Sequence, residues 1–147
     1  MGDNMHIERL KKQEIPQLLA LYKELADYEN SVEICEQIFY KIDSDENYYL
    51  LVAKENNKII GTALGIVCYS IPVSAMPFMI IEDVVVKKEY RKKGVGKKLF
   101  EKLDKIANEN NCAYSFLVSG EKRKGAHKFY LKQGYNEPVK GFRKKYI

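Results

Sequence analysis

An apolar run that leads through a basic, glycine-containing turn into a helical pattern constrains the fold more than any other part of the chain. Met79–Val86 is apolar apart from two acidic residues, which indicates a buried strand. The basic turn Lys87–Lys93 follows, and helical spacing of apolar residues continues over Gly94–Asn110. Because Ala113–Val118 then reads as another strand, we expect a crossover unit with a parallel strand pair.

The rest of the chain supplies the other elements of a mixed sheet flanked by helices. Apolar spacing and turn residues predict helices at Gln13–Ala26, Val32–Tyr40 and Gly125–Gln133, and strands at His6–Leu10, Tyr48–Lys54, Ile59–Tyr69 and Phe142–Ile147. Gly61 and Gly65 are expected at bulges or close backbone approaches. The predicted order is β-α-α-β-β-β-α-β-α-β, so the fold class is α/β with a mixed α+β sheet. We expect residues 1–147 to form a single domain.

Composition excludes several classes of protein. A chain of 147 residues with 46% hydrophobic and 31% charged residues is ordinary for one globular domain with one sizeable core. No apolar run approaches the ~18 residues that a membrane span needs, and the polar N-terminal segment lacks a signal-peptide core. Three widely spaced cysteines match no metal-ligand pattern. We therefore expect a cytoplasmic protein that does not bind membranes.

The net charge of +5 is unevenly distributed. Residues 1–80 hold 7 basic and 12 acidic residues, whereas residues 81–147 hold 18 basic and 8 acidic residues. A basic C-terminal half favours an anionic partner, such as phosphate groups or nucleic acid, and a solvated lysine-rich face explains it equally well.

The turn after the apolar strand has the features of an anion site. A helix N-terminus directs free backbone N–H groups and its positive end to one point. Gly94 and Gly96 would let phosphate oxygens approach the backbone, and seven basic residues lie between Lys87 and Lys98. The segment contains neither the P-loop pattern nor the G-x-G-x-x-G pattern of dinucleotide sites.

Two motifs in this order resemble those of one superfamily. Arg91-Lys92-Lys93-Gly94-Val95-Gly96 is similar to the R-x-x-G-x-G pyrophosphate motif of the GNAT superfamily of acyl-CoA N-acyltransferases. Ala126-His127-Lys128-Phe129-Tyr130 through Tyr135 resembles its second signature, A-x-x-F-Y-x-x-x-G-[FY]. The resemblance covers residues 79–135 by motif. The second motif together with Gly141-Phe142-Arg143-Lys144-Lys145 looks like small bacterial members, including aminoalkylphosphonate N-acetyltransferases. Ile81-Glu82-Asp83-Val84 resembles the equivalent strand of glucosamine-phosphate N-acetyltransferases.

The resemblance implies a function and a cofactor. The chain would be an N-acetyltransferase that moves the acetyl group of acetyl-CoA onto a primary amine of a small molecule, by direct attack while both substrates are bound. The backbone of Val84, Val85 and Val86 would hold the pantetheine arm and the thioester oxygen. The turn residues Arg91, Lys92, Lys93, Gly94, Val95, Gly96 and Lys97 would hold the pyrophosphate. Family members often carry Asn where this chain has Arg123, so that side-chain contact is not carried over.

Two residues are candidates for proton transfer. Tyr130 matches the general acid of the family by position, with core packing as its alternative role; for Phe129 we expect core packing. Glu82 could accept the proton of the ammonium, and its alternative role is a structural partner of a lysine. Strand alternation places Asp83 on the opposite face. The two histidines, His6 and His127, give no metal signature, so no metal is expected.

The acceptor remains open at this stage. The two N-terminal helices and the loop Ile71–Phe78 should form its site, and both sub-family resemblances favour an anionic amine. A protein or peptide amine is the alternative substrate; a nucleic-acid-binding module and a catalytically inactive acetyl-CoA sensor are the non-enzyme alternatives. The basic residues follow no nucleic-acid-binding motif, so we expect no nucleic-acid partner. Homodimers are common in the superfamily, usually through the C-terminal strand, and the sequence leaves the oligomeric state open.

Overall fold

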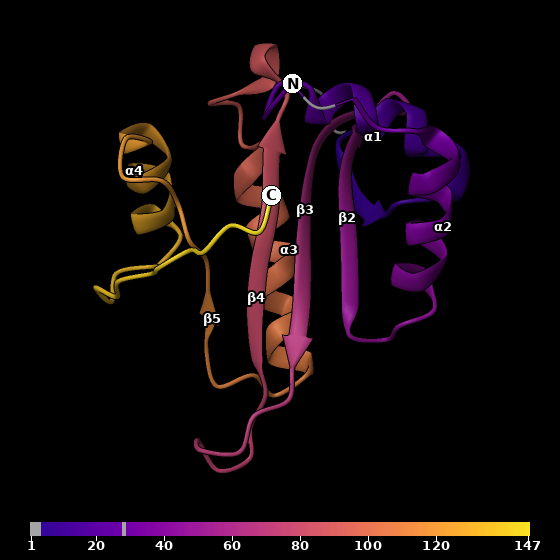
Figure 1. Cartoon of the computed structure of the whole chain (residues 1–147). Helices are drawn as coiled ribbons and strands as arrows, with labels where there is room; N and C mark the ends of the chain where they lie inside the picture. Colours follow the sequence, from indigo (N-terminus) through magenta and orange to yellow (C-terminus); the bar gives the residue numbers. More distant parts are fainter. Residues whose placement is uncertain (1–3, 28) are drawn as a thin grey trace.

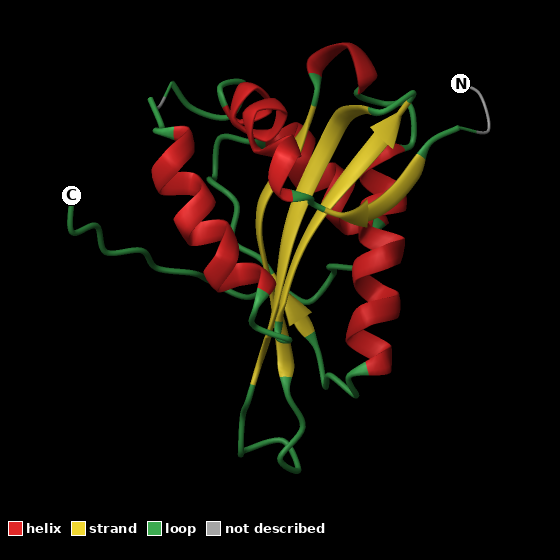
Figure 2. Ribbon diagram, turned by 90° about the vertical axis from the view of Figure 1, so that its right-hand side faces the viewer, coloured by secondary structure: helices red, strands yellow, loops and turns green. Residues whose placement is uncertain are grey.

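A five-stranded sheet with helices on both faces forms the structure, a computed structural model that describes residues 4–27 and 29–147 (Figures 1 and 2). The strands are β1 His6–Arg9, β2 Tyr48–Glu55, β3 Lys58–Cys68, β4 Phe78–Val86 and β5 Ser115–Phe116. The helices are α1 Ile15–Tyr22, α2 Val32–Asp43, α3 Val95–Glu109 and α4 Lys124–Lys132, with 3-10 turns η1 Lys12–Glu14 and η2 Lys88–Tyr90. Within the described residues, no helix is long and apolar enough to cross a membrane.

The sheet has the strand order β1-β2-β3-β4-β5. The first four strands pair in antiparallel fashion, and β4 pairs with β5 in parallel, which confirms the predicted crossover unit. The predicted hairpin joins β2 to β3 through Asn56 and Asn57, whose φ angles of 50° and 62° are those of a type I′ turn.

Two apolar layers cover the two faces of the sheet. One layer packs the sheet against α3 through residues such as Leu99, Phe100 and Leu103, and the other packs it against α1 and α2. The glycines of β3 explain how closely α3 approaches. A Cβ on Gly65 would lie 2.7 Å from Leu103 Cδ2, and one on Gly61 would lie 2.9 Å from Val95 Cγ1. The prediction of close approaches at these glycines is therefore confirmed.

The C-terminal segment departs from the sequence prediction. The strand predicted over Phe142–Ile147 is wrong, because the structure has no regular element there. The side chains of Phe142 and Tyr146 are 88% and 87% exposed, so the apolar pattern has no layer of this chain to pack against. The strand predicted over Ala113–Val118 shortens to β5, and the helix predicted over Gln13–Ala26 divides into η1, α1 and a following turn.

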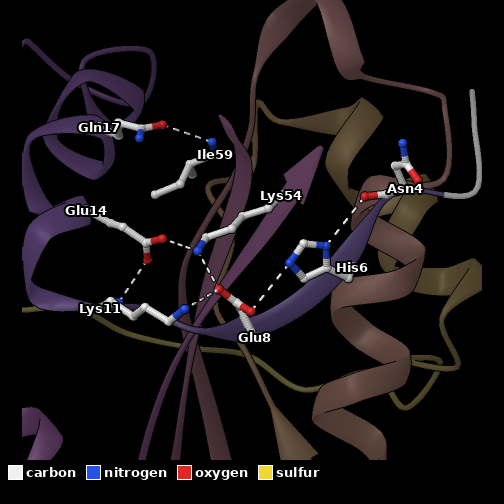
Figure 3. Close-up of polar contacts among 8 residues, drawn as sticks. All are labelled: Asn4, His6, Glu8, Lys11, Glu14, Gln17, Lys54 and Ile59. Carbon is white, nitrogen blue, oxygen red and sulfur yellow. Dashed lines mark hydrogen bonds and ion pairs between the residues drawn. The ribbon is translucent and has the colours of Figure 1, made fainter. Parts of the chain in front are cut away.

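A buried ionic cluster ties the N-terminal strand to β2, at the sheet edge opposite β5 (Figure 3). Lys54 is only 5% exposed and lies between the carboxylates of Glu8 and Glu14. Burial opposes the charge on Lys54, but the hydrogen bonds to the two carboxylates outweigh it and raise its pKa. The other Glu14 oxygen accepts the backbone N–H of Lys11 at 2.9 Å. The cluster is a structural element of this edge, with all its donors and acceptors within the chain.

Candidate active site

The turn between β4 and α3 has a backbone conformation suited to an anion. Lys92 and Gly94 have φ angles of 60° and 86°, in the left-handed region, and a lysine there is strained. Gly94 caps α3 without a side-chain hydrogen bond, which leaves the first-turn N–H groups of the helix uncapped by side chains. A Cβ on Gly94 would meet no atom within 4 Å, so the approach to these groups is open. These features fit a pyrophosphate.

The predicted cofactor residues gather at this end of α3. Arg91, Lys92, Lys93 and Lys97 lie at the surface, and Val95 is buried against the sheet. Gly96 has a second reason to lack a side chain, because a Cβ there would lie 2.9 Å from Cζ of Phe129. The predicted core role of Phe129 is confirmed by its packing against α3.

The second half of β4 offers a free backbone edge. The parallel pairing with β5 ends at Ile80, and in the described chain the residues of β4 that follow pair only with β3. Figure 1 shows the chain leaving β5 and running away from β4 toward α4. Part of this edge is already used, since the Val86 carbonyl accepts the Nε–H of Arg91 at 3.0 Å. The unpaired edge at Val84–Val86 fits an extended, amide-bearing ligand arm, which could add to it as a strand does.

A β-bulge interrupts β4 directly after Glu82, at Asp83 and Val84. Leu64 pairs with Glu82 and Thr62 pairs with Val85, so two residues of β4 oppose one residue of β3. Asp83 has a φ of 54° in this bulge. The regular alternation that would separate Glu82 from Asp83 therefore does not hold here.

Burial and then the carboxylate of its neighbour Asp83 raise the pKa of Glu82. The charge of Arg143 from the C-terminal tail opposes this shift. Burial also raises the pKa of Asp83. A carboxyl group with a raised pKa is a better proton acceptor when ionised than an ordinary one. The bulge thus supplies basic carboxylates next to the free edge of β4.

Tyr130 lies in the second half of α4, in an aromatic cluster between α4 and α3. Its side chain is buried and packs near Phe100, Phe129 and Tyr135. Burial raises the pKa of the Tyr130 phenol, and the charge of Arg123 opposes that rise. A phenol with this pKa stays protonated at neutral pH and can donate a proton. Among the described residues, no hydrogen bond or ion pair joins Tyr130 to Glu82.

Three residues near the site escaped the sequence analysis. Tyr22, at the end of α1, packs against the apolar layer that contains Val85 of β4. Burial and then the Asp83 carboxylate raise the pKa of Tyr22. Arg143 belongs to the segment predicted as a strand. Glu24 contacts the turn after β4 by a hydrogen bond and an ion pair. Helical periodicity marks Tyr22 as a core residue and leaves Glu24 as one of many surface acids, so no local signal distinguishes them.

Two surface hollows lie outside the set of predicted cofactor-binding and catalytic residues. A hollow of about 400 Å³ beside Asn4, His6, Asn56 and Asn57 lies at the N-terminal edge of the sheet, and none of the predicted site residues lines it. The described residues contain no group of three or more metal-ligating side chains.

Comparison with known proteins agrees with this arrangement. The model of the Acetyltransferase (GNAT) family matches residues 13–135. Thialysine N-epsilon-acetyltransferase of Sus scrofa is 27% identical over 141 residues, covering 87% of this chain and 82% of the relative. Glucosamine-6-phosphate N-acetyltransferase from Arabidopsis thaliana has a TM-score of 0.88 at 23% identity, with 99% and 100% of the two chains covered. A GNAT family acetyltransferase of Staphylococcus aureus subsp. aureus USA300_TCH1516 has a TM-score of 0.79 at 26% identity, covering 97% and 98%.

The family match spans both motif regions and most of the sheet, and the solved neighbours share the whole fold. The chain belongs to the acetyltransferase (GNAT) family and is an acyltransferase.

Proposed function

We propose that this protein is an acetyl-CoA-dependent N-acetyltransferase that acetylates a primary amine of a small molecule, by direct attack while both substrates are bound. One observation carries the proposal: the glycine turn with an open approach and an uncapped helix start, directly after a strand with a free edge. We propose that residues 1–147 form a single N-acetyltransferase domain.

The cofactor would be held at two places. The backbone N–H groups and cationic side chains of Arg91–Lys97 bind the pyrophosphate. The backbone of Val84–Val86 pairs with the amides of the pantetheine arm. Acetyl-CoA supplies an activated acetyl thioester, and these contacts place its carbonyl beside the bulge of β4.

The residues of the bulge would serve the amine. Glu82 accepts the proton of the ammonium group, directly or through a water molecule, because a neutral amine is the nucleophile. A backbone N–H near Val85 stabilises the negative charge that develops on the thioester oxygen, a contribution of about 3 kcal/mol per donor. Tyr130 donates a proton to the departing thiolate of coenzyme A, which its protonated phenol is able to do.

Several features support a small amine as the acceptor. The names of two similar proteins describe N-acetylation at the ε-nitrogen of thialysine and N-acetylation of glucosamine 6-phosphate. We place the acceptor site at the end of α1 and the bulge, where Tyr22 lies beside Asp83. Arg143 near Glu82 is a cation that could bind an anionic group on the amine. We further propose a cytoplasmic location and a homodimer.

Release of free thiol from acetyl-CoA over a panel of amines tests the proposal. The panel contains thialysine, lysine, glucosamine 6-phosphate, an aminoalkylphosphonate and a lysine-containing peptide. We expect at least one small amine to be acetylated with a kcat/KM well above that of the peptide. Turnover of the peptide alone would show that the acceptor is a protein. Absence of turnover with every amine, together with normal acetyl-CoA binding, would favour a sensor.

A further inference from the structure

A single carboxylate from the α1 side of the sheet holds the turn that follows β4. Glu24 lies two residues after the end of α1, in a turn closed by the bond from its own N–H to the Leu21 carbonyl at 3.0 Å. Its Oε2 accepts the backbone N–H of Lys88 at 2.8 Å and lies 3.6 Å from Nη2 of Arg91. The contact spans 64 positions of sequence, so it is a tertiary one.

Arg91 is fixed from two directions by these contacts. Its Nε–H donates to the Val86 carbonyl at 3.0 Å, and its Nη2 faces Glu24. Within the described chain, no hydrogen bond or ion pair engages its Nη1 group, and the side chain is 52% exposed. A planar guanidinium held by two of its nitrogens can still present the third to a phosphate oxygen in a fixed orientation.

The position of Glu24 is unfavourable for anion binding taken alone. A carboxylate beside the cationic turn lowers the local positive potential and repels a pyrophosphate. The turn, however, contains Lys92 with a left-handed φ of 60°, a strained conformation for a lysine that persists only where neighbouring structure enforces it. The Glu24 contact is at the first residue of η2, just before this strained stretch.

We propose that Glu24 is a positioning residue that holds η2 and the Arg91 side chain in the geometry that binds the cofactor pyrophosphate. The proposal rests on the proposed function for the identity of the ligand. Glu24 touches neither the acetyl group nor the amine in this account; it acts through Lys88 and Arg91. Burial raises the pKa of Tyr22, two residues before Glu24, and Tyr22 is close enough to Asp83 for the Asp83 charge to raise it further. The end of α1 is therefore near both the proposed acceptor site and the turn between β4 and α3 that would bind the cofactor.

Four variants distinguish a role of Glu24 in positioning the turn from an effect of its negative charge alone. Glu24→Ala removes both contacts, whereas Glu24→Gln keeps an oxygen for the Lys88 N–H and loses the charge. Lys88→Pro deletes the N–H itself, and the backbone accepts it because residue 88 begins η2 and Lys87 has φ −53° and ψ 133°. Lys88→Ala controls for loss of the lysine side chain.

Glu109→Ala is the matched surface control. Glu109 pairs with Lys105 at 3.8 Å, at the far end of α3, and its side chain is 60% exposed. The variant removes one exposed carboxylate, as Glu24→Ala does, without touching the turn. We expect its acetyl-CoA affinity to match that of the wild type.

Titration calorimetry and steady-state kinetics give the main readout. We expect Glu24→Ala and Lys88→Pro each to raise the Kd and KM for acetyl-CoA about tenfold and to leave kcat within about twofold. Glu24→Gln should raise them only about threefold, and Lys88→Ala less than that. Tighter binding in both Glu24 variants would overturn the proposal, because it would show that the carboxylate only repels the ligand. Unchanged affinity in Glu24→Ala and Lys88→Pro would overturn it as well.

Amide hydrogen exchange on the ligand-free protein separates this proposal from the function on which it rests. Glu24→Ala should speed exchange over residues 88–96 and leave the second half of α3 as in the wild type. Faster exchange in a protein that does not bind acetyl-CoA would leave the positioning contact standing and refute the cofactor. Normal acetyl-CoA binding with unchanged exchange and affinity would refute the positioning role alone.

Discussion

Phe129 of α4 fills the space that a side chain on Gly96 of α3 would occupy. A Cβ on Gly96 would lie 2.9 Å from Cζ of the ring, and the ring also meets Phe100 edge-to-face at 5.4 Å between centroids. The motif Arg91–Gly96 and the motif that begins at Ala126 are thus in direct contact. The packing of α4 on α3 therefore sets the position of Tyr130 relative to the turn between β4 and α3.

Gly96→Ala should therefore disturb this contact. Since the added methyl group needs the Phe129 ring to move, we expect a loss of about 1–3 kcal/mol in the free energy of unfolding and a lower kcat. Urea denaturation and thiol release measure the two effects. Gly125→Ala is the control: it lies within α4, and its Cβ would meet no atom within 4 Å, so it should stabilise by about 0.5–1 kcal/mol. Equal stability of the two variants would contradict the packing account.

Tyr130→Phe should retain acetyl-CoA affinity and lose turnover by ~10²-fold or more, because the variant keeps the packed ring and removes the proton donor. Calorimetry and thiol release test the two halves. Tyr135→Phe removes a neighbouring buried hydroxyl that has no hydrogen-bond partner among the described residues, and turnover should persist. A Tyr130→Phe enzyme with wild-type kcat would remove Tyr130 from the mechanism.

Glu82→Gln should abolish the acidic limb of the pH–rate profile. The pKa of Glu82 is raised above its usual value, so wild-type kcat/KM should fall as the pH drops through that raised pKa and the carboxylate becomes protonated. Asp83→Asn removes the neighbouring charge that raises this pKa, so it should move the limb to lower pH and keep activity. An acidic limb that survives in Glu82→Gln would assign the base to another group.

Lys54→Met should destabilise the fold by about 3 kcal/mol or more at neutral pH, because it leaves the carboxylates of Glu8 and Glu14 without their buried partner. The pKa of Glu8 is lowered in the fold, so its contribution is present at neutral pH and is lost as the pH falls through the lowered pKa. The gap between wild type and variant should therefore narrow in acid. Exposed Lys58→Met in β3 is the control and should cost less than about 0.5 kcal/mol. A gap that does not change with pH would contradict the ionic origin of the effect.

The local sequence pattern predicts those elements whose apolar positions match the faces that are buried in the structure. The apolar run at β4, the glycine turn and the periodic face of α3 required no knowledge of distant residues. The sequence predicts close backbone approaches at Gly61 and Gly65 of β3, and in the structure α3 packs directly against both.

Features that depend on contacts between residues far apart in the sequence could not be predicted from local patterns. The bulge at Asp83 depends on how β4 registers with β3, and a strand pattern alone predicts regular alternation. The contact of Glu24 with Lys88 joins residues 64 positions apart. The tail Phe142–Ile147 is predicted as a strand, but strand formation needs a partner edge, which the structure does not give it.

Thermal unfolding with and without acetyl-CoA tests the central claim most directly, with ATP and nucleic acid as controls. A ligand at about 100 times its Kd stabilises the folded state by about 2.7 kcal/mol, which raises the Tm of a domain of this size by several degrees. We predict a rise of that size with acetyl-CoA and a much smaller one with the controls. An unchanged Tm with acetyl-CoA and a raised one with nucleic acid would contradict the account and make the basic half of the chain a nucleic-acid-binding surface.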